Sequence, residues 1–225
     1  MNKDIIVFDF ETGGRNPHTC QVTQLAAIAI DGRTLRAKGT FNSEMWAETD
    51  DEKAVKKGLG PIEEGALKVT GKTREQIAKA PKPKVVWKKF CTFVEKYNWK
   101  GTSFFAPIPA GYNILGYDMI IIDRLCKEYG PWDEQKQRQK LFHQINKIDM
   151  MDNYYMWTEG DPNIRARSMD SIRERMWENY SGDAHDALQD VKDTANLMIK
   201  FMKTHRAVYR NLKLEKAFAN GNTYV

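Results

Sequence analysis

The sequence predicts an α/β domain built on a mixed five-stranded sheet whose first three strands are antiparallel and whose faces are flanked by helices. Three short apolar runs, separated by turn residues, fill most of the first 42 positions. Further along the chain, stretches with helical periodicity alternate with two more strand-like runs. Early strands followed by alternating helices and strands are typical of an α/β domain with a mixed sheet.

The three early runs are predicted to be strands because of their period and their boundaries. IIVFDFE (5–11) has the two-residue alternation of a buried strand, QVTQLAAIAID (21–31) ends in an Asp-Gly turn, and RTLRAKGTFN covers 33–42. The connections between them are short enough for an antiparallel meander.

A polar segment with glycine and proline breaks follows at residues 44–82, and short helices are expected around 62–69 and 73–78. Apolar residues then recur at helical spacing, so residues 84–97 are predicted to form an amphipathic helix.

The second half of the chain alternates between strands and helices. A fourth strand is predicted at 104–113 and a fifth at 145–150, with a helix over 118–129 between them. Helical pieces are expected to continue to residue 180, and a long helix is predicted over residues 184–203.

No internal repeat, low-complexity tract or linker divides these elements, so one domain is expected over residues 1–205, followed by a basic tail at 206–225. The net charge of the chain is +5, and from residue 200 onwards six Lys and Arg residues stand against one Glu. A basic tail suits a polyanionic partner. A solvated helix end has the same composition, and charge alone does not separate the two interpretations.

Composition excludes several classes of protein. Hydrophobic residues make up 41% of the chain and charged residues 29%, which is typical of a soluble globular protein. No apolar run approaches the ~18 residues of a membrane span, and carboxylates occupy the start, where a signal peptide would be apolar. The three cysteines lie far apart without a CxxC pair, which indicates reduced thiols and no zinc site. A cytoplasmic protein that contacts no membrane is therefore expected.

Two carboxylates end an otherwise apolar row on the first predicted strand. Because side chains alternate along a strand, Ile5 and Val7 share a face with Asp9 and Glu11. Partly buried like charges are unfavourable unless a cation or hydrogen-bond donors offset them, and oxygen ligands of this kind suit magnesium or manganese. The alternative is a polar strand end that enters the turn at Thr12.

Asp190 falls on a face of the long predicted helix where apolar residues are expected. The central core stripe of this helix is predicted to comprise Ala184, Leu188, Val191, Ala195, Met198 and Met202. Asp190 lies on the flank beside this stripe, between Ala187 and Thr194, whereas Asp193 is expected to face solvent. An aspartate among apolar neighbours needs a partner, and a shared metal ion is a good candidate.

Three further polar residues have simple structural alternatives. Asp118 stands at the start of a predicted helix, where an aspartate commonly caps the N-terminus. Asn113 lies in a turn, where its side chain can satisfy backbone groups. His185 is close to a helix N-terminus, which lowers the pKa of a histidine and favours the neutral, proton-accepting form. A surface or capping role suits His185 equally well.

Taken in order, DFETGG (9–14), GYNILGYD (111–118) and HDALQD (185–190) resemble the motifs of the DEDDh, or DnaQ-like, 3′→5′ exonuclease superfamily. The resemblance extends over roughly residues 5–202 and includes ALKVTGKTREQIAKAP (66–81). The spacing within GYNILGYD, and the stretch DFETGGRNPHTCQVTQLAAIAID, are most similar to the exonuclease I branch, which acts on single-stranded DNA. The additional domains of that branch have no counterpart in this sequence.

This resemblance implies an RNase H-like fold and a two-metal mechanism with Mg²⁺ or Mn²⁺ that hydrolyses single-stranded nucleic acid, DNA being favoured, to nucleoside 5′-monophosphates. It implies that Asp9 contacts both ions, that Glu11 and Asp190 hold the first, and that Asp118 holds the second. It also implies that His185 accepts a proton from the attacking water.

By the same resemblance, main-chain groups of Thr12 and Gly13, together with Asn113, are expected near the terminal nucleotide. Unpaired bases are generally held by stacking and by a basic groove. One or two substrate contacts are expected among the aromatic and arginine residues near the motifs, most of the others serving the core or a solvated helix face: Phe10, Tyr112, Tyr117, Trp157, Tyr180, Arg165, Arg167, Arg173 and Arg175.

Two alternatives remain open. An RNA-trimming 3′→5′ exoribonuclease or deadenylase has the same motifs, because none of the motif residues reports on the 2′-hydroxyl. A catalytically inactive nucleic-acid-binding module belongs to another class, and the complete set of five catalytic residues argues against it. A replication or repair protein is a further expected partner.

Overall fold

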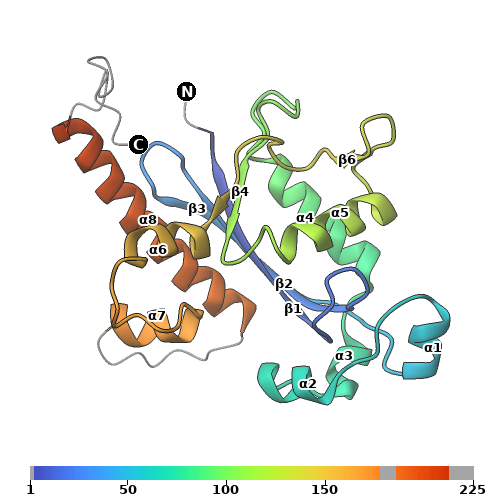
Figure 1. Cartoon of the computed structure of the whole chain (residues 1–225). Helices are drawn as coiled ribbons and strands as arrows, with labels where there is room; N and C mark the ends of the chain where they lie inside the picture. The colour runs from blue at the N-terminus through green and yellow to red at the C-terminus, as the bar shows by residue number, and fades with distance from the viewer. Residues whose placement is uncertain (1–2, 178–185, 213–225) are drawn as a thin grey trace.

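The computed structural model describes residues 3–177 and 186–212, and its main sheet has five strands in the order β3-β2-β1-β4-β7 (Figure 1). The strands β1 (Ile5–Thr12), β2 (Val22–Ile30) and β3 (Ala37–Glu44) form an antiparallel meander. The strands β4 (Ile108–Gly111) and β7 (Ile148–Asp149) run parallel to β1. The predicted mixed five-stranded sheet, with three antiparallel strands first, is confirmed.

Helices cover both faces of this sheet (Figure 1). On one face lie α4 (Pro83–Glu95) and α5 (Asp118–Tyr129). On the other lie α6 (Met150–Thr158), α7 (Met169–Met176) and the long α8 (Ala187–Leu212). The sheet is therefore the middle layer between two apolar clusters.

The alternation of β1 divides its side chains between these two clusters. Ile6, Phe8 and Phe10 enter the cluster beneath α4 and α5, where they are at most 5% exposed. Ile5 and Val7 enter the cluster beneath α8. The two carboxylates of this strand follow Ile5 and Val7 on the α8 side, as the two-residue period predicts.

A lobe of three short helices connects β3 to α4. It consists of α1 (Asp51–Lys56), α2 (Glu64–Thr70) and α3 (Arg74–Lys79), and in Figure 1 it projects from the end of the sheet where β1 finishes. The helix α3 begins with a capping box, in which Thr73 and Gln76 satisfy each other's backbone N–H groups. The helices α2 and α3 lie where the sequence predicts short helices, whereas α1 was not predicted.

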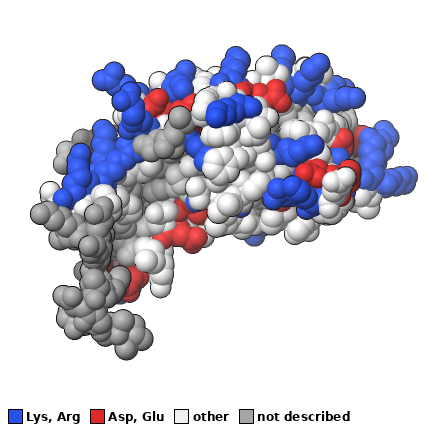
Figure 2. Space-filling model, turned by 90° about the horizontal axis from the view of Figure 1, so that it is seen from above, with Lys and Arg blue, Asp and Glu red and all other residues white. Residues whose placement is uncertain are grey.

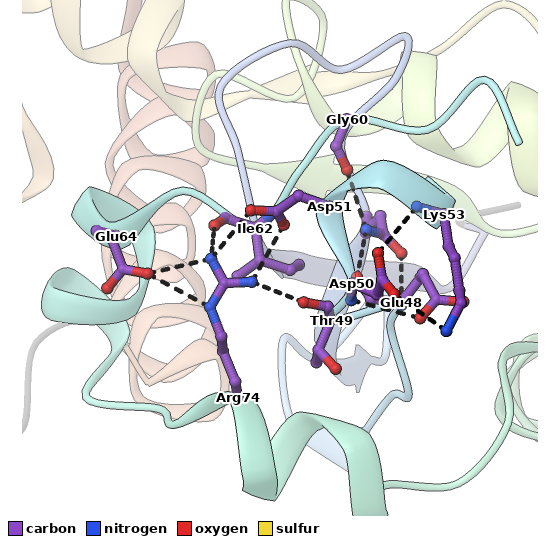
Figure 3. Close-up of polar contacts among 10 residues, drawn as sticks. Glu48, Thr49, Asp50, Asp51, Lys53, Gly60, Ile62, Glu64 and Arg74 are labelled. Carbon is purple, nitrogen blue, oxygen red and sulfur yellow. Dashed lines mark hydrogen bonds and ion pairs between the residues drawn. The ribbon is translucent and has the colours of Figure 1, made fainter. Parts of the chain in front are cut away.

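Arg74, the first residue of α3, holds the lobe together (Figure 3). Its Nη1 donates to the carbonyl of Thr49 at 2.9 Å, and its Nη2 donates to the carbonyl of Ile62 at 2.6 Å. It also forms ion pairs of 3.1 Å with Asp51 and with Glu64. One guanidinium therefore links the start of α1, the loop before α2 and the start of α2.

The lobe is also attached to the loop that follows β1. The N–H of Glu63 donates to the carbonyl of Gly13 at 2.7 Å, and the N–H of Gly60 donates to the carbonyl of Thr19 at 2.8 Å. A Cβ at Gly13 would lie 2.3 Å from Cδ1 of Ile62, so a larger residue here would require the Ile62 side chain to move. These contacts place α2 beside the end of β1.

The third strand begins later than predicted. The side chain of Asp31 accepts hydrogen bonds from the N–H groups of Arg33 and Thr34, and Leu35 has a φ of 60°. Residues 31–36 are therefore used by a turn, and the prediction that a strand starts at residue 33 is wrong.

Other boundaries differ at the end of the chain. The helix α8 continues to Leu212, so it crosses the predicted boundary between the domain and the tail at residues 205 and 206. A small hairpin of β5 (Trp132–Asp133) and β6 (Arg138–Gln139) was not predicted. Residues 178–185, which include the predicted helical residues 178–180 and 184–185, lie outside the described residues, as do residues 213–225 of the tail. Within the described ranges, no helix is long and apolar enough to cross a membrane.

Candidate active site

Three carboxylates converge where α8 crosses the end of β1. Asp9 and Glu11 come from β1 and Asp190 comes from the first turn of α8, and one oxygen of each lies within 4.8 Å of the others. Each residue is partly buried. The site therefore joins two residues of one strand to a third that follows them by about 180 positions in the chain.

Asp118 lies next to this cluster as the first residue of α5, with 3% of its surface exposed. The N-cap position of α5 is occupied by Tyr117, so the alternative interpretation, in which Asp118 caps the helix, is wrong. Its Oδ1 instead accepts a hydrogen bond from the N–H of Phe10, in β1, at 3.2 Å. This bond holds the buried carboxylate beside the strand that carries Asp9.

The pKa values of these carboxyl groups are raised. Burial, followed by the charge of Asp190, raises the pKa of Asp9 to about 7. Burial, followed by the charge of Asp9, raises the pKa of Glu11 to about 8. Burial, followed by the charge of Asp9, also raises the pKa of Asp118 well above its usual range. When these carboxyl groups are ionised, their negative charges must be balanced by nearby positive charge. Arg173 and Lys72 lower the pKa values of Asp9 and Glu11, but these values remain raised.

Part of that positive charge comes from Arg173 of α7, which is 3% exposed. Its guanidinium donates to the carboxylates of Asp190, Asp193 and Asp170. The prediction that Asp193 faces solvent is wrong, because Asp193 is 3% exposed and its Oδ2 lies 2.9 Å from Nε of Arg173. The expectation that Arg173 lies on a solvated helix face is also wrong, because Arg173 is buried.

A second cation approaches the site from the helical lobe. The Nζ of Lys72, between α2 and α3, donates to Oε1 of the buried Gln24 in β2 at 2.8 Å. The Nε2 of Gln24 donates to Asp186, immediately before α8, at 3.0 Å. The charge of Lys72 lowers the pKa of Glu11, against the stronger effects that raise it. Sequence reasoning missed Lys72, Gln24 and Asp186, because their partners are far away in the chain.

The residues predicted to contact substrate lie around the same strand end. The hydroxyl of Thr12 lies 2.7 Å from the hydroxyl of Tyr117 and donates to the carbonyl of Gly14 at 2.8 Å. The N–H of Gly13 donates to the carbonyl of Gln21 at 2.7 Å. Thr12 therefore directly follows Glu11 in β1, whereas the N–H and the carbonyl of Gly13 are both engaged, by Gln21 and Glu63.

Asn113 lies in the turn after β4 with a left-handed φ of 57°. Its N–H donates to Oδ1 of Asp149 at 2.8 Å, and the residue as a whole is exposed. The turn is fixed by Asp149, so the side chain of Asn113 is not needed to satisfy these backbone groups.

A cavity of about 300 Å³ begins at Glu11 and extends along α2. Its wall includes Glu11, Thr12 and Tyr117 on one side and Glu63, Val69 and Thr70 on the other. The helical lobe therefore forms one side of the space next to the site. His185 and Tyr180, both predicted near the site, lie outside the described residues.

Comparison with known proteins agrees with this arrangement. A family model described as an exonuclease, RNase_T, matches residues 6–198. Exonuclease I from E. coli, in complex with a dT13 oligonucleotide, superposes with a TM-score of 0.67 at 16% identity, over 95% of this chain and 44% of that chain. Exonuclease I from Methylocaldum szegediense gives a TM-score of 0.61 at 20% identity, over 88% of this chain and 40% of that chain.

A further similar structure, cell-death related nuclease 4, gives a TM-score of 0.64 at 15% identity, over 90% of this chain and 64% of that chain. These similarities confirm the predicted RNase H-like exonuclease fold. The chain spans less than half the length of the exonuclease I chains that it matches. A search of curated proteins found no match.

Proposed function

The chain belongs to the RNase_T exonuclease family, and from this membership we propose that it is a divalent-metal-dependent 3′→5′ exonuclease that shortens single-stranded DNA one nucleotide at a time. The observation that carries the proposal is the convergence of Asp9, Glu11 and Asp190 within 4.8 Å, beside the buried Asp118.

The residues present fit a divalent cation. Among the described residues, the site offers carboxylate oxygens, which suit magnesium or manganese, and burial together with mutual repulsion raises the pKa values of Asp9 and Glu11. Asp9, Glu11 and Asp190 would hold one ion, and Asp9 with Asp118 a second. When bound, two such ions supply an activated water and stabilise the leaving 3′ oxygen.

The other proposed residues of the site position the substrate or accept a proton from the attacking water. Main-chain groups of Thr12 and Gly13, with Asn113, would lie near the terminal nucleotide. His185 would accept a proton from the attacking water, and its replacement by alanine is then expected to lower the rate by roughly 10²–10⁴-fold while metal binding is retained. Loss of metal binding in that variant would make His185 a ligand instead.

Single-stranded DNA is proposed as substrate because the similar E. coli exonuclease I forms complexes with single-stranded DNA oligonucleotides. The test uses 5′-labelled single-stranded DNA, RNA and duplex DNA, each with Mg²⁺ or with EDTA. The expected result is a ladder shortened from the 3′ end of single-stranded DNA in Mg²⁺ only. A faster ladder on RNA would favour the exoribonuclease, and binding without cleavage would favour the inactive module.

The same assay separates the proposed ligands from ordinary surface carboxylates. Asp50 and Glu52 repeat the D-x-E spacing of Asp9 and Glu11 in an exposed segment, so Glu52→Gln is a matched control for Glu11→Gln. Glu11→Gln and Asp9→Ala are expected to abolish the ladder, and Glu52→Gln to preserve it. Fragments from internal cleavage, or full activity in Asp9→Ala, would contradict the proposal.

A further inference from the structure

A second cavity, of about 540 Å³, lies between α6, α7 and α8, away from the cavity beside α2. Its lining is chiefly aromatic and apolar, with two cations at its edge, and comprises mainly Tyr154, Trp157, Arg175, Met176, Lys200 and Phe201. Ligand sites are typically cavities of this size that combine an apolar lining with a few polar groups.

Trp157 forms an aromatic wall of this cavity and remains 50% exposed. Its ring packs against Phe201, with 5.4 Å between ring centroids, and stacks with His205 at 5.3 Å. Its Nε1 also donates to Nε2 of His205 at 2.6 Å. The indole is thus held in place by α8 while half of its surface stays open, as a base-stacking surface requires.

The charged residues that line the cavity are both cationic. Arg175 and Lys200 are exposed, and no carboxylate belongs to the lining among the described residues. Lys and Arg side chains are spread over the face of the molecule seen in Figure 2, with fewer Asp and Glu side chains between them. A flat apolar wall beside cations matches a base next to its phosphates, whereas Arg175 and Lys200 would repel a cationic ligand.

The cavity is aligned with the carboxylate site along α8. Asp190 and Phe201 are eleven positions apart, which is close to three helical turns, so both side chains leave the same face of the helix. The distance along the axis is about 16 Å. The helix α7 connects the same two places, since its Arg173 contacts Asp190 and its Arg175 lines the cavity.

We propose that this cavity is a second nucleotide-binding site, which holds a nucleotide of the single strand several positions before the 3′ end. The base stacks on Trp157, and Arg175 and Lys200 contact the neighbouring phosphates. This inference rests on the proposed function for the identity of the strand, and it adds to that function a preference for strands long enough to reach both sites.

Binding of 5′-fluorescein-labelled oligothymidylates of 3 and 15 nucleotides, measured by anisotropy in EDTA, tests the proposal without cleavage. Trp157→Ala is expected to weaken binding of the 15-mer about tenfold and to leave the 3-mer unchanged, since stacking of one base is lost. Trp157→Phe should restore most of the affinity. The control is Trp99→Ala, because Trp99 is 54% exposed and lies beside Lys100 and Phe105 at a distant loop.

The cations are tested in the same way. Lys200→Gln should reduce the salt dependence of binding to the 15-mer by about one phosphate contact. Lys192→Gln is the control, since Lys192 is exposed on the same helix but is not part of the cavity lining. Equal salt slopes for both variants would contradict a role for Lys200.

The outcomes separate this inference from the proposed function. Cleavage by the wild type, with unchanged 15-mer binding in a folded Trp157→Ala protein, overturns the second site alone. Length-dependent binding through Trp157, without cleavage in Mg²⁺, supports the second site and overturns the nuclease. A change from a dimer to a monomer in Trp157→Ala, with unchanged binding, would make the cavity an interface between copies and would overturn the inference.

Discussion

Arg173 of α7 forms a buried ion pair with Asp193 of α8, with 2.9 Å between Nε and Oδ2, and both residues are at most 3% exposed. The same guanidinium contacts Asp190, one turn earlier on α8. One buried cation therefore joins the structural contact between two helices to a proposed metal ligand.

Loss of this cation should destabilise the protein. Arg173→Met leaves the buried carboxylate of Asp193 without its guanidinium, and the free energy of unfolding is expected to fall by about 3–5 kcal/mol. Urea denaturation in EDTA measures the change. Glu174→Gln is the control, because Glu174 is exposed on the same helix, and it should change stability by no more than about 0.5 kcal/mol. Equal losses in the two variants would contradict the structural role of Arg173.

The raised pKa values of Asp9 and Glu11 predict how stability depends on pH. In the unfolded chain these groups have ordinary pKa values of 3.8 and 4.5, whereas the folded, metal-free values are about 7 and about 8. Between these limits the folded state binds more protons, so stability in EDTA should fall as pH rises from about 4 to about 8.

Melting temperatures over this pH range, in EDTA and in Mg²⁺, check the prediction. Stabilisation by Mg²⁺ should grow with pH, because the ion binds the ionised carboxylates. The double variant Asp9→Asn, Glu11→Gln should flatten the pH dependence in EDTA, and Glu52→Gln should not. A Mg²⁺ effect that is constant with pH would argue against binding at these two residues.

Asp118→Asn should separate stability from activity. The amide oxygen can still accept the hydrogen bond from Phe10, and the repulsion of Asp9 is removed, so stability in EDTA at pH 8 should be equal or higher. Exonuclease activity is expected to fall about a hundredfold or more, because one proposed metal ligand is lost. If Asp118 served only to hold β1 against α5, the variant would retain its activity.

Arg206 should contribute to stability, although it belongs to the predicted basic tail. Its guanidinium donates to the carbonyls of Gly32 at 2.8 Å and Arg33 at 2.7 Å, which fastens α8 to the turn between β2 and β3. Arg206→Ala is expected to lower the free energy of unfolding by about 1–2 kcal/mol in thermal or urea denaturation. The neighbouring Arg210→Ala, at an exposed position, should have little effect. A large effect of Arg210→Ala alone would reverse this assignment.

Sequence periodicity predicted the parts of the fold that repeat locally. The two-residue alternation of β1 and the helical spacing of α4 and α8 are local properties of the sequence, and they alone predict that Asp9, Glu11 and Asp190 lie on apolar faces. The turn at Asp31-Gly32 was predicted, but its length was not, because it depends on the side chain of Asp31 accepting bonds from N–H groups as far along as Thr34.

The residues that contact the proposed metal ligands could not be predicted from local sequence periodicity. Arg173 and Asp193 both look solvent-exposed in the sequence, because a charged residue reveals its burial only through a partner, in this case 20 positions away. Gln24 and Asp186 are separated by 162 positions, so neither one's neighbours indicate the bond between them. A periodic pattern of apolar residues predicts a helix or strand face, whereas a single contact between two residues far apart in the chain leaves no pattern in the sequence.

The straight run of α8 from Asp190 to Phe201 restricts how this protein can vary. Each inserted or deleted residue between these positions would rotate one end of the helix by about 100° relative to the other. The carboxylate and the aromatic ring would then leave different faces, whatever the new residue was. Substitutions on the exposed side, at Lys192 or Asn196, have no such consequence. Relatives that share both sites should therefore differ in composition along this stretch but keep the same number of residues.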